Sequence, residues 1–260
     1  MNDPKQMLQA AHQEGELSDA ALAALSIPDL GAQIQAGLGI HPDDVPASEV
    51  VLVTMMPDDS GSIRFASNAQ AVRDGHNLVL DALAASKSKD GVLVHARYLN
   101  GTVLYPYCAL DGALRMDSRN YDPNGGTPLY DQSVVLLGTV LAKAREFAQA
   151  GVPARTVTLL ITDGADEGST RSRAGDVAAL VRDMLRAERH IVAALGVDNG
   201  STDFRAVFKE MGLDDRWVLT PGDNASDIRR AFAVFSQSAA RASSGAGSFS
   251  KVSIGGFGAP

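Results

Sequence analysis

Oxygen-bearing side chains follow an apolar run near the start of the chain, in the stretch PDDSGSI at residues 57–63. Asp58, Ser60 and Ser62 alternate along it, so an extended or gently looping backbone turns all three toward one point. Their carboxylate and hydroxyl oxygens suit a hard divalent cation such as Mg²⁺, which takes six oxygen ligands. An ordinary polar turn accounts for these three residues equally well, so other parts of the chain must decide between the two interpretations.

Two later stretches carry the same kind of oxygen ligand. Thr127 lies in NGGTPLYD, a glycine-rich loop directly before a predicted helix, and Asp163 ends a predicted strand in LLITDGADEG. In open α/β sheets, ligands bind in the crevice outside the carboxyl ends of the strands. We therefore expect Thr127 and Asp163 to meet residues 57–63 in that crevice. The predicted metal ligands are Asp58, Ser60, Ser62, Thr127 and Asp163.

The order of these motifs resembles the von Willebrand factor A (vWA) domain with its metal-ion-dependent adhesion site (MIDAS). That family has D-x-S-x-S after the first strand, a threonine in a glycine-rich loop and an aspartate in a T-D-G turn. The resemblance covers roughly residues 49–241. It implies that Asp58 and Asp163 bind the ion directly or through water, with hydroxyls from the other three residues. It also implies that the ion, Mg²⁺ first with Mn²⁺ or Ca²⁺ as alternatives, takes a Glu or Asp carboxylate from a partner protein.

Alternating strand-like and helix-like segments must position these side chains. Apolar, β-branched runs predict strands near residues 49–56, 91–99, 102–110, 155–164, 190–197 and 216–220. Helical spacing of apolar residues separates most of them, which predicts an α/β fold with a mostly parallel sheet covered on both faces. Asn100-Gly101 predicts a hairpin, and Pro106 places its second strand at a sheet edge. The resemblance implies the same architecture, a Rossmann-like, doubly wound sheet of six strands with one antiparallel edge strand.

The chain divides into three predicted parts. Residues 1–45 read as an N-terminal extension of two or three short helices, with Ser18 and Asp19 as capping residues for one of them. Residues 46–241 form the vWA domain. Residues 242–260 are rich in serine and glycine and aperiodic, which predicts a flexible tail.

Composition excludes several functions. The net charge is −8, from 31 acidic and 23 basic residues, which argues against nucleic-acid binding and against an anionic membrane surface. A single cysteine, Cys108, and five scattered histidines argue against a cysteine- or histidine-based zinc site. The first residues show no secretory signal, and no apolar run approaches membrane-spanning length. We therefore expect a cytoplasmic protein.

The resemblance implies a binding module rather than an enzyme. The motifs DDSGSI and GGTPLYD and the segment FAVFSQSAARAS look most like bacterial cytoplasmic members of the tellurium-resistance and stress-response type. An alternative is a subunit that docks on an AAA+ ATPase. A metal-dependent phosphotransferase or hydrolase is the enzymatic alternative, but Ser60 stands where an aspartyl-phosphate enzyme needs a second acid. The chain also has no phosphate-binding glycine loop and no G-x-S-x-G motif.

Neighbouring polar residues have simpler interpretations. We interpret the acids that flank the site, Asp59, Asp131, Asp166 and Glu167, as solvated side chains rather than ligands. The histidines in strand and helix contexts (His76, His95, His190) are interpreted as core residues. Pro57, directly before Asp58, is expected to end the first strand early.

Overall fold

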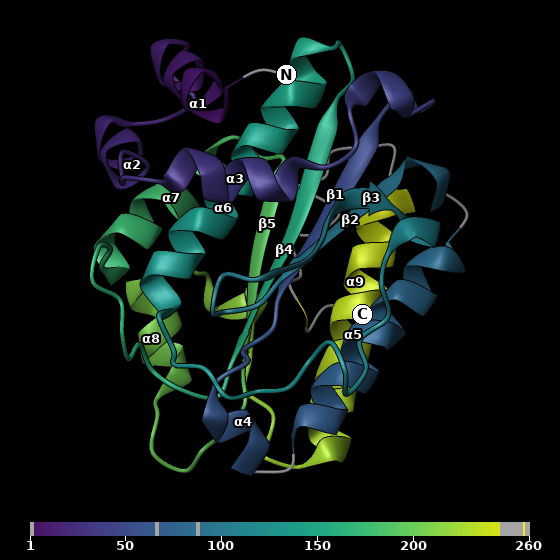
Figure 1. Ribbon diagram of the computed structural model, residues 1–260, viewed down its shortest axis with the longest axis vertical. Helices are drawn as coiled ribbons and strands as arrows, with labels where there is room; N and C mark the ends of the chain where they lie inside the picture. The colour runs from purple at the N-terminus through teal and green to yellow at the C-terminus, as the bar shows by residue number, and fades with distance from the viewer. Residues whose placement is uncertain (1–2, 66–67, 87–88, 245–256, 258–260) are drawn as a thin grey trace.

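The computed structural model describes residues 3–65, 68–86, 89–244 and 257, and its centre is one six-stranded sheet with strand order β3-β2-β1-β4-β5-β6 (Figure 1). The strands are β1 (Val50–Met56), β2 (Val92–Arg97), β3 (Val103–Ala109), β4 (Ala154–Thr162), β5 (His190–Gly196) and β6 (Val218–Leu219). All neighbours pair in parallel except β2 and β3, which pair antiparallel. The predicted mostly parallel sheet with one antiparallel edge strand is confirmed.

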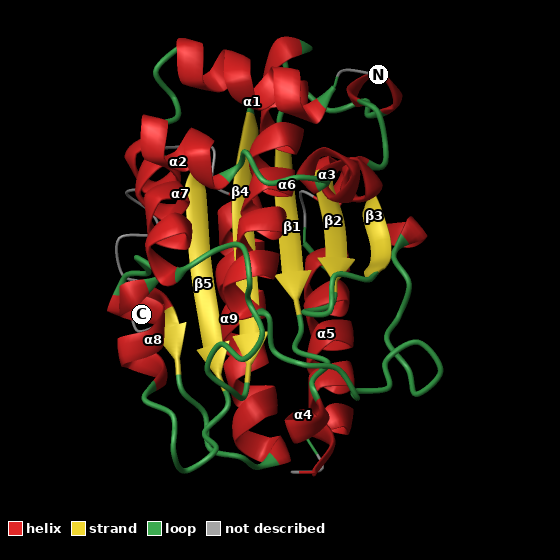
Figure 2. Cartoon of the chain, turned by 60° about the vertical axis from the view of Figure 1, so that its left-hand side comes forward, coloured by secondary structure: helices red, strands yellow, loops and turns green. Residues whose placement is uncertain are grey.

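Helices cover both faces of the sheet (Figure 2). The α-helices are α1 (Pro4–Gln13), α2 (Asp19–Ala24), α3 (Leu30–Leu38), α4 (Gly61–Phe65), α5 (Ala69–Ala84), α6 (Leu129–Gln149), α7 (Ala174–Arg186), α8 (Phe204–Glu210) and α9 (Ala225–Ser244). Short 3₁₀ turns are η1 (Pro42–Asp44), η2 (Lys89–Gly91), η3 (Leu110–Gly112) and η4 (Asp215–Trp217). The long helices α5 and α9 pack together on one face, and α6 and α7 cover the other. No helix among the described residues is both long and apolar enough to cross a membrane.

The two faces of the sheet differ in chemistry. Toward α5 and α9 the strands present apolar side chains, such as Val53 and Leu159, which form one core cluster with both helices. The alternate positions face α6 and include many buried polar side chains: Thr54, His95, Arg97, Thr156, Thr158, Thr162 and His190. Strand β4 is therefore buried on both faces, but its face toward α6 carries Thr156, Thr158 and Thr162 beside Leu160. The prediction of core histidines is confirmed by the burial of all three.

The β2–β3 hairpin turns where the sequence predicted. Gly101 has φ of 93°, a conformation that favours glycine, and its N–H donates to the Tyr98 carbonyl at 2.9 Å. The Asn100 side chain accepts the Thr102 N–H at 2.7 Å. Pro106 is exposed on β3, the outer strand, so its missing N–H costs no ladder bond.

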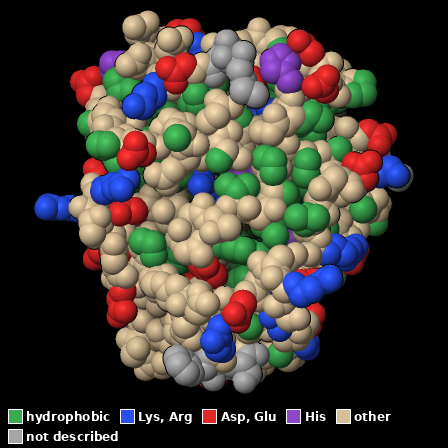
Figure 3. Space-filling view, in the orientation of Figure 1, with side chains coloured by type: hydrophobic (Ala, Val, Ile, Leu, Met, Phe, Trp, Pro, Cys, Tyr) green, Lys and Arg blue, Asp and Glu red, His purple; other side chains and the backbone are tan. Residues whose placement is uncertain are grey.

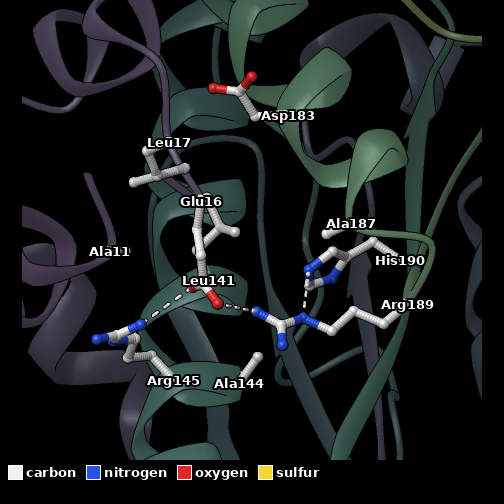
Figure 4. Close-up of a pocket in the computed structure, with 10 residues that line it drawn as sticks. All are labelled: Ala11, Glu16, Leu17, Leu141, Ala144, Arg145, Asp183, Ala187, Arg189 and His190. Carbon is white, nitrogen blue, oxygen red and sulfur yellow. Dashed lines mark hydrogen bonds and ion pairs between the residues drawn. The ribbon is translucent and has the colours of Figure 1, made fainter. Parts of the chain in front are cut away.

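The N-terminal helices form a layer against α6 and α7 rather than a separate body. Ser18 caps α2, and its N–H and O–H both donate to the buried Asp183 of α7 at 2.7 Å. Glu16 pairs with Arg145 at 3.2 Å and with Arg189 at 3.1 Å. Glu16, Asp183 and the two arginines line a cavity of about 20 Å³, the size of one water molecule (Figure 4).

The predicted tail begins inside α9, since residues 242–244 are helical. Most of it, 245–256 and 258–260, lies outside the described residues. Phe257 is described, and its ring lies 5.3 Å from that of Trp217 and 6.5 Å from that of Phe235.

Candidate metal site at the carboxyl edge of the sheet

Asp58 is fixed between the ends of β1 and β4. Strand β1 stops at Met56, as expected from Pro57, whose carbonyl accepts the Leu99 N–H at 3.1 Å. The Asp58 side chain is 0% exposed. Its Oδ1 accepts the Ser60 N–H at 2.7 Å, and its Oδ2 accepts the Thr162 hydroxyl at 2.7 Å. The carboxylate therefore has a defined orientation at the carboxyl ends of β1 and β4.

Three of the other predicted ligands join one hydrogen-bonded cluster with Asp58. Ser62 Oγ donates to Asp163 Oδ1 at 2.7 Å, and Ser60 Oγ lies 2.8 Å from Ser62 Oγ. The Asp163 N–H in turn points to Asp58 Oδ2 at 3.4 Å. Ser60 and Asp163 are buried, whereas Ser62, on α4, is exposed. The cluster thus opens to solvent on the Ser62 side.

Thr127 lies on the loop that borders this cluster. Its carbonyl accepts the Glu167 N–H at 2.8 Å. In the same loop, the Gly125 carbonyl accepts the Gly61 N–H at 3.1 Å, which joins this loop to the stretch at residues 57–63. A Cβ built on Gly164, the neighbour of Asp163, would lie 3.8 Å from Thr127 Oγ1. Thr127 is 6% exposed. The structure therefore brings the predicted residues together at one edge of the sheet, with four joined in a hydrogen-bonded cluster and Thr127 on the adjacent loop.

Two positioning residues were missed by sequence reasoning. The Thr162 hydroxyl donates to Asp58, and the Tyr121 hydroxyl donates to the Asp58 backbone carbonyl. Thr162 had a local signal, since it directly precedes Asp163 at the strand end. Tyr121 had none, because it lies in a long loop whose path depends on tertiary contacts.

The interpretation of Asp59 as a solvated acid is wrong. Asp59 is 5% exposed, and its Oδ1 accepts the Asn100 N–H at 2.9 Å. Its carbonyl accepts the N–H groups of Asn124 and Gly125, both at 2.9 Å. The turn after Pro57 directs this side chain inward, so Asp59 ties the site to the hairpin and to the Thr127 loop.

Two further flanking acids also have structural roles, which corrects the same interpretation. Asp131 accepts three backbone N–H groups, from residues 170–172. Asp166 accepts the Tyr130 N–H and the Ser169 hydroxyl. Glu167 is exposed, as expected of a solvated acid.

Electrostatics favours a cation at this site. Burial raises the pKa of Asp58, and burial with the nearby Asp58 charge raises the pKa of Asp163 to about 6. Asp59, also raised mainly by burial, has a pKa of about 6. No ion pair joins these three acids to a Lys, Arg or His among the described residues. Clustered carboxylates without a counter-charge are costly, and a divalent ion would offset that cost.

The donor set suits a hard metal ion. Two carboxylates and three hydroxyls offer only oxygen, the donor type that Mg²⁺, Mn²⁺ and Ca²⁺ take. Within the described part of the chain, no group of three or more His, Cys, Asp and Glu side chains is arranged as a metal site. The crevice therefore differs from acid-rich or histidine-rich centres, because hydroxyls make up more than half of its predicted ligands.

Comparison with known proteins identifies the fold. No family model matches the chain, and no curated protein matches it in sequence. The pilus adhesin SpaC from Lactobacillus rhamnosus GG superposes with a TM-score of 0.54 at 15% identity, over 75% of this chain and 30% of that chain. Proximal thread matrix protein 1 (PTMP1) from the mussel byssus gives a TM-score of 0.50 at 17% identity, over 74% of this chain and 46% of its own.

PTMP1 has also been solved with a zinc-occupied MIDAS motif. The SpRpn10 VWA domain aligns with a TM-score of 0.49 at 8% identity, over 71% of this chain and 94% of that domain. This chain spans less than half the length of the SpaC and PTMP1 chains. At these identities the likeness concerns the fold alone. Strand order, strand directions and helix layers together show a doubly wound, mostly parallel six-stranded sheet, a fold shared with the SpaC and PTMP1 structures.

Proposed function

We propose that this chain is a metal-dependent protein-interaction module, which binds a divalent cation in the crevice and, through it, an acidic residue of a partner protein. One observation carries the proposal: buried Asp58 and Asp163 share a hydroxyl-lined cluster that opens at Ser62 and has no ion pair to a described cation. A cation held there would supply positive charge to an incoming carboxylate. Mg²⁺ is the proposed ion, with Mn²⁺ and Ca²⁺ as alternatives.

The predicted ligands would have two different roles in holding the ion. Asp58 and Asp163 would supply the negative charge that holds the ion, and Ser60, Ser62 and Thr127 would supply neutral oxygens. Two acids leave a divalent ion without surplus negative charge, so a partner carboxylate remains attractive to it. Thr162 and Tyr121 would keep Asp58 in place, and Asp59 would hold the bordering loops together.

The cellular location, the type of assembly and the division into domains are also proposals. We propose a cytoplasmic role in a bacterial stress-response assembly of the tellurium-resistance type, with residues 1–45 as an extension, 46–241 as the vWA domain and 242–260 as a tail. Docking on an AAA+ ATPase is the alternative within the binding class. The enzymatic alternative, a phosphotransferase or hydrolase, predicts metal-dependent cleavage of phosphate esters that Asp58→Ala abolishes.

The test is thermal unfolding with increasing Mg²⁺ or Mn²⁺. Asp58→Ala should lose the rise in Tm, while Asp43→Asn, an exposed acid in η1, should keep it. Thr127→Val retains volume and removes one neutral oxygen, so it should weaken ion binding less than Asp58→Ala. Capture of partners at fixed Mg²⁺ should nevertheless fall in Thr127→Val. Equal Mg²⁺ shifts in wild type and Asp58→Ala would refute the metal site.

A further inference from the structure

Arg97, at the end of β2, is a buried cation without an acidic partner. It is 1% exposed, and no carboxylate of the described residues lies within ion-pair distance. Its Nη1 donates to Thr139 Oγ1 at 3.4 Å and its Nη2 to the Gly101 carbonyl at 3.2 Å, both neutral groups. Its Nε is buried and has no hydrogen-bond partner among the described residues. Burial lowers the pKa of Arg97 to about 10, so it stays charged at neutral pH.

Such a charge is expensive to keep. An uncompensated buried ion costs several kcal/mol, and a well-packed apolar side chain at the same place is commonly more stable. Two other buried cations among the described residues are paired, Lys143 with Glu146 at 2.6 Å and Arg145 with Glu16 at 3.2 Å. Arg97 therefore differs from them by the lack of a counter-ion in the described part of the protein.

Both hydrogen-bond partners of Arg97 lie next to residues that line one pocket. The pocket lies between α3 and α6, has a volume of about 210 Å³, and is lined by residues that include Gln132 and Val135 of α6. Thr139, which accepts from Arg97, donates to the Val135 carbonyl at 2.8 Å. A Cβ built on Gly101 would lie 3.1 Å from Gln132 Oε1, a buried atom that has no hydrogen-bond partner in the described part of the chain. The guanidinium thus lies behind the pocket wall.

The pocket lining itself carries one guanidinium, that of Arg171, which is exposed. Arg171 lines it, and its one hydrogen bond there is to the Pro28 carbonyl at 3.4 Å, with no ion pair to a described acid. The acid in the lining, Asp131, is engaged by the backbone N–H groups of residues 170–172. Arg171 in the lining and Arg97 behind the wall are therefore both without an ion-pair partner among the described residues. The exposed face over α3 and α6 is hollowed near its middle (Figure 3).

We propose that the pocket between α3 and α6 binds a small oxyanion, a carboxylate or a phosphate, whose charge compensates Arg97 and Arg171. The Arg171 guanidinium in the lining presents a planar fork of donors that matches such oxyanions. Arg97 attracts the anion across a low-dielectric wall, where charge interactions are stronger than in water. Gln132 can present its amide N–H groups to the same ligand, since its O and N exchange by rotation. This site is separate from the metal crevice and does not depend on the proposed function.

The experiment follows the Tm of the whole chain in metal-free buffer with inorganic phosphate or acetate as the probe. Sodium chloride holds the ionic strength constant. Saturating probe should raise the Tm of the wild type by about 5 °C or more. A response to phosphate alone identifies a phosphate ligand, and a response to acetate as well identifies a carboxylate-accepting site. No response to either probe overturns the proposal.

Variants then locate the site. Arg97→Met should lose the shift and Arg171→Met should reduce it. Arg205→Met, an exposed arginine of α8 that pairs with Asp215, is the matched control and should keep the shift. An unchanged shift in Arg97→Met overturns the proposal. Should Arg97→Met fail to fold, the Nε–H resonance of Arg97 in wild-type protein decides, since it must move on titration with the active probe.

Discussion

The Tyr121 hydroxyl donates a hydrogen bond to the backbone carbonyl of Asp58, and both groups are buried. The Tyr121 ring also packs on that of Tyr98, with centroids 5.5 Å apart. A residue of the long loop before α6 therefore holds the first candidate metal ligand from behind, through its main chain.

Tyr121→Phe tests this link. Loss of the hydroxyl leaves a buried carbonyl without its partner, which should cost about 1–3 kcal/mol of unfolding free energy. Because Asp58 loses support, the Mg²⁺ concentration for half-maximal stabilisation should also rise. Chemical denaturation with and without Mg²⁺ measures both effects, with Tyr130→Phe, a partly exposed tyrosine, as control. A loss of stability with unchanged Mg²⁺ dependence would separate Tyr121 from the metal site.

Asp163→Asn should stabilise the metal-free protein at pH 7. The raised pKa of about 6 means that burial disfavours the charged form, so removal of the charge should gain about 1–3 kcal/mol. Asparagine retains an oxygen that can accept the Ser62 hydroxyl. The same variant should lose its Mg²⁺ response. Denaturant unfolding in chelator and in Mg²⁺ reports both, and a variant less stable than wild type in chelator would contradict the electrostatic argument.

The effect of Mg²⁺ should depend on pH in a defined direction. A carboxyl whose folded pKa is raised binds protons more tightly in the native state, so metal-free stability falls as pH rises from about 4 through about 6. Mg²⁺ needs the ionised form, so its Tm shift should be large at pH 7.5 and small at pH 5. Equal shifts at the two pH values would count against coordination by Asp163.

The buried histidines give the opposite trend. Burial lowers the pKa of His76 to about 4 and those of His95 and His190 to about 3. Their contribution to stability is therefore complete above pH 6.5 and is lost as pH falls toward those values. The pH dependence of metal-free unfolding should therefore combine the carboxylate and histidine contributions. A His76→Gln variant should lose only the part of the acid-side fall in stability that comes from His76.

Ser18 and Asp183 should be coupled energetically. The two hydrogen bonds from Ser18 to a carboxylate that is 3% exposed join the N-terminal layer to α7. Ser18→Ala should cost about 1–2 kcal/mol, partly as a lost helix cap. A double-mutant cycle with Asp183→Asn, read by urea unfolding, should give a coupling energy of about 0.5 kcal/mol or more. Additive effects on the free energy of unfolding would show that this contact does not stabilise the packing of the N-terminal helices on α7.

Local patterns were sufficient to predict the strands, the hairpin and the crevice. Asp58, Ser60 and Ser62 could be placed because the strand before them and the parallel sheet determine where they lie. The same reasoning failed for Asp59, since nothing local indicates that the turn after Pro57 faces the hairpin rather than solvent. It also missed Tyr121, whose contact spans a loop without periodicity, and the polar face under α6, where threonines occupy alternate positions of an apolar-looking strand.

The two margins of the sheet have a consequence for association between copies. At one margin β3 carries Pro106, which offers no N–H to a further strand, and at the other β6 consists of Val218 and Leu219 alone. An exposed strand recruits another chain through a continuous row of unpaired N–H and C=O groups. Neither margin provides such a row over any length, so the sheet is a poor template for growth into fibrils.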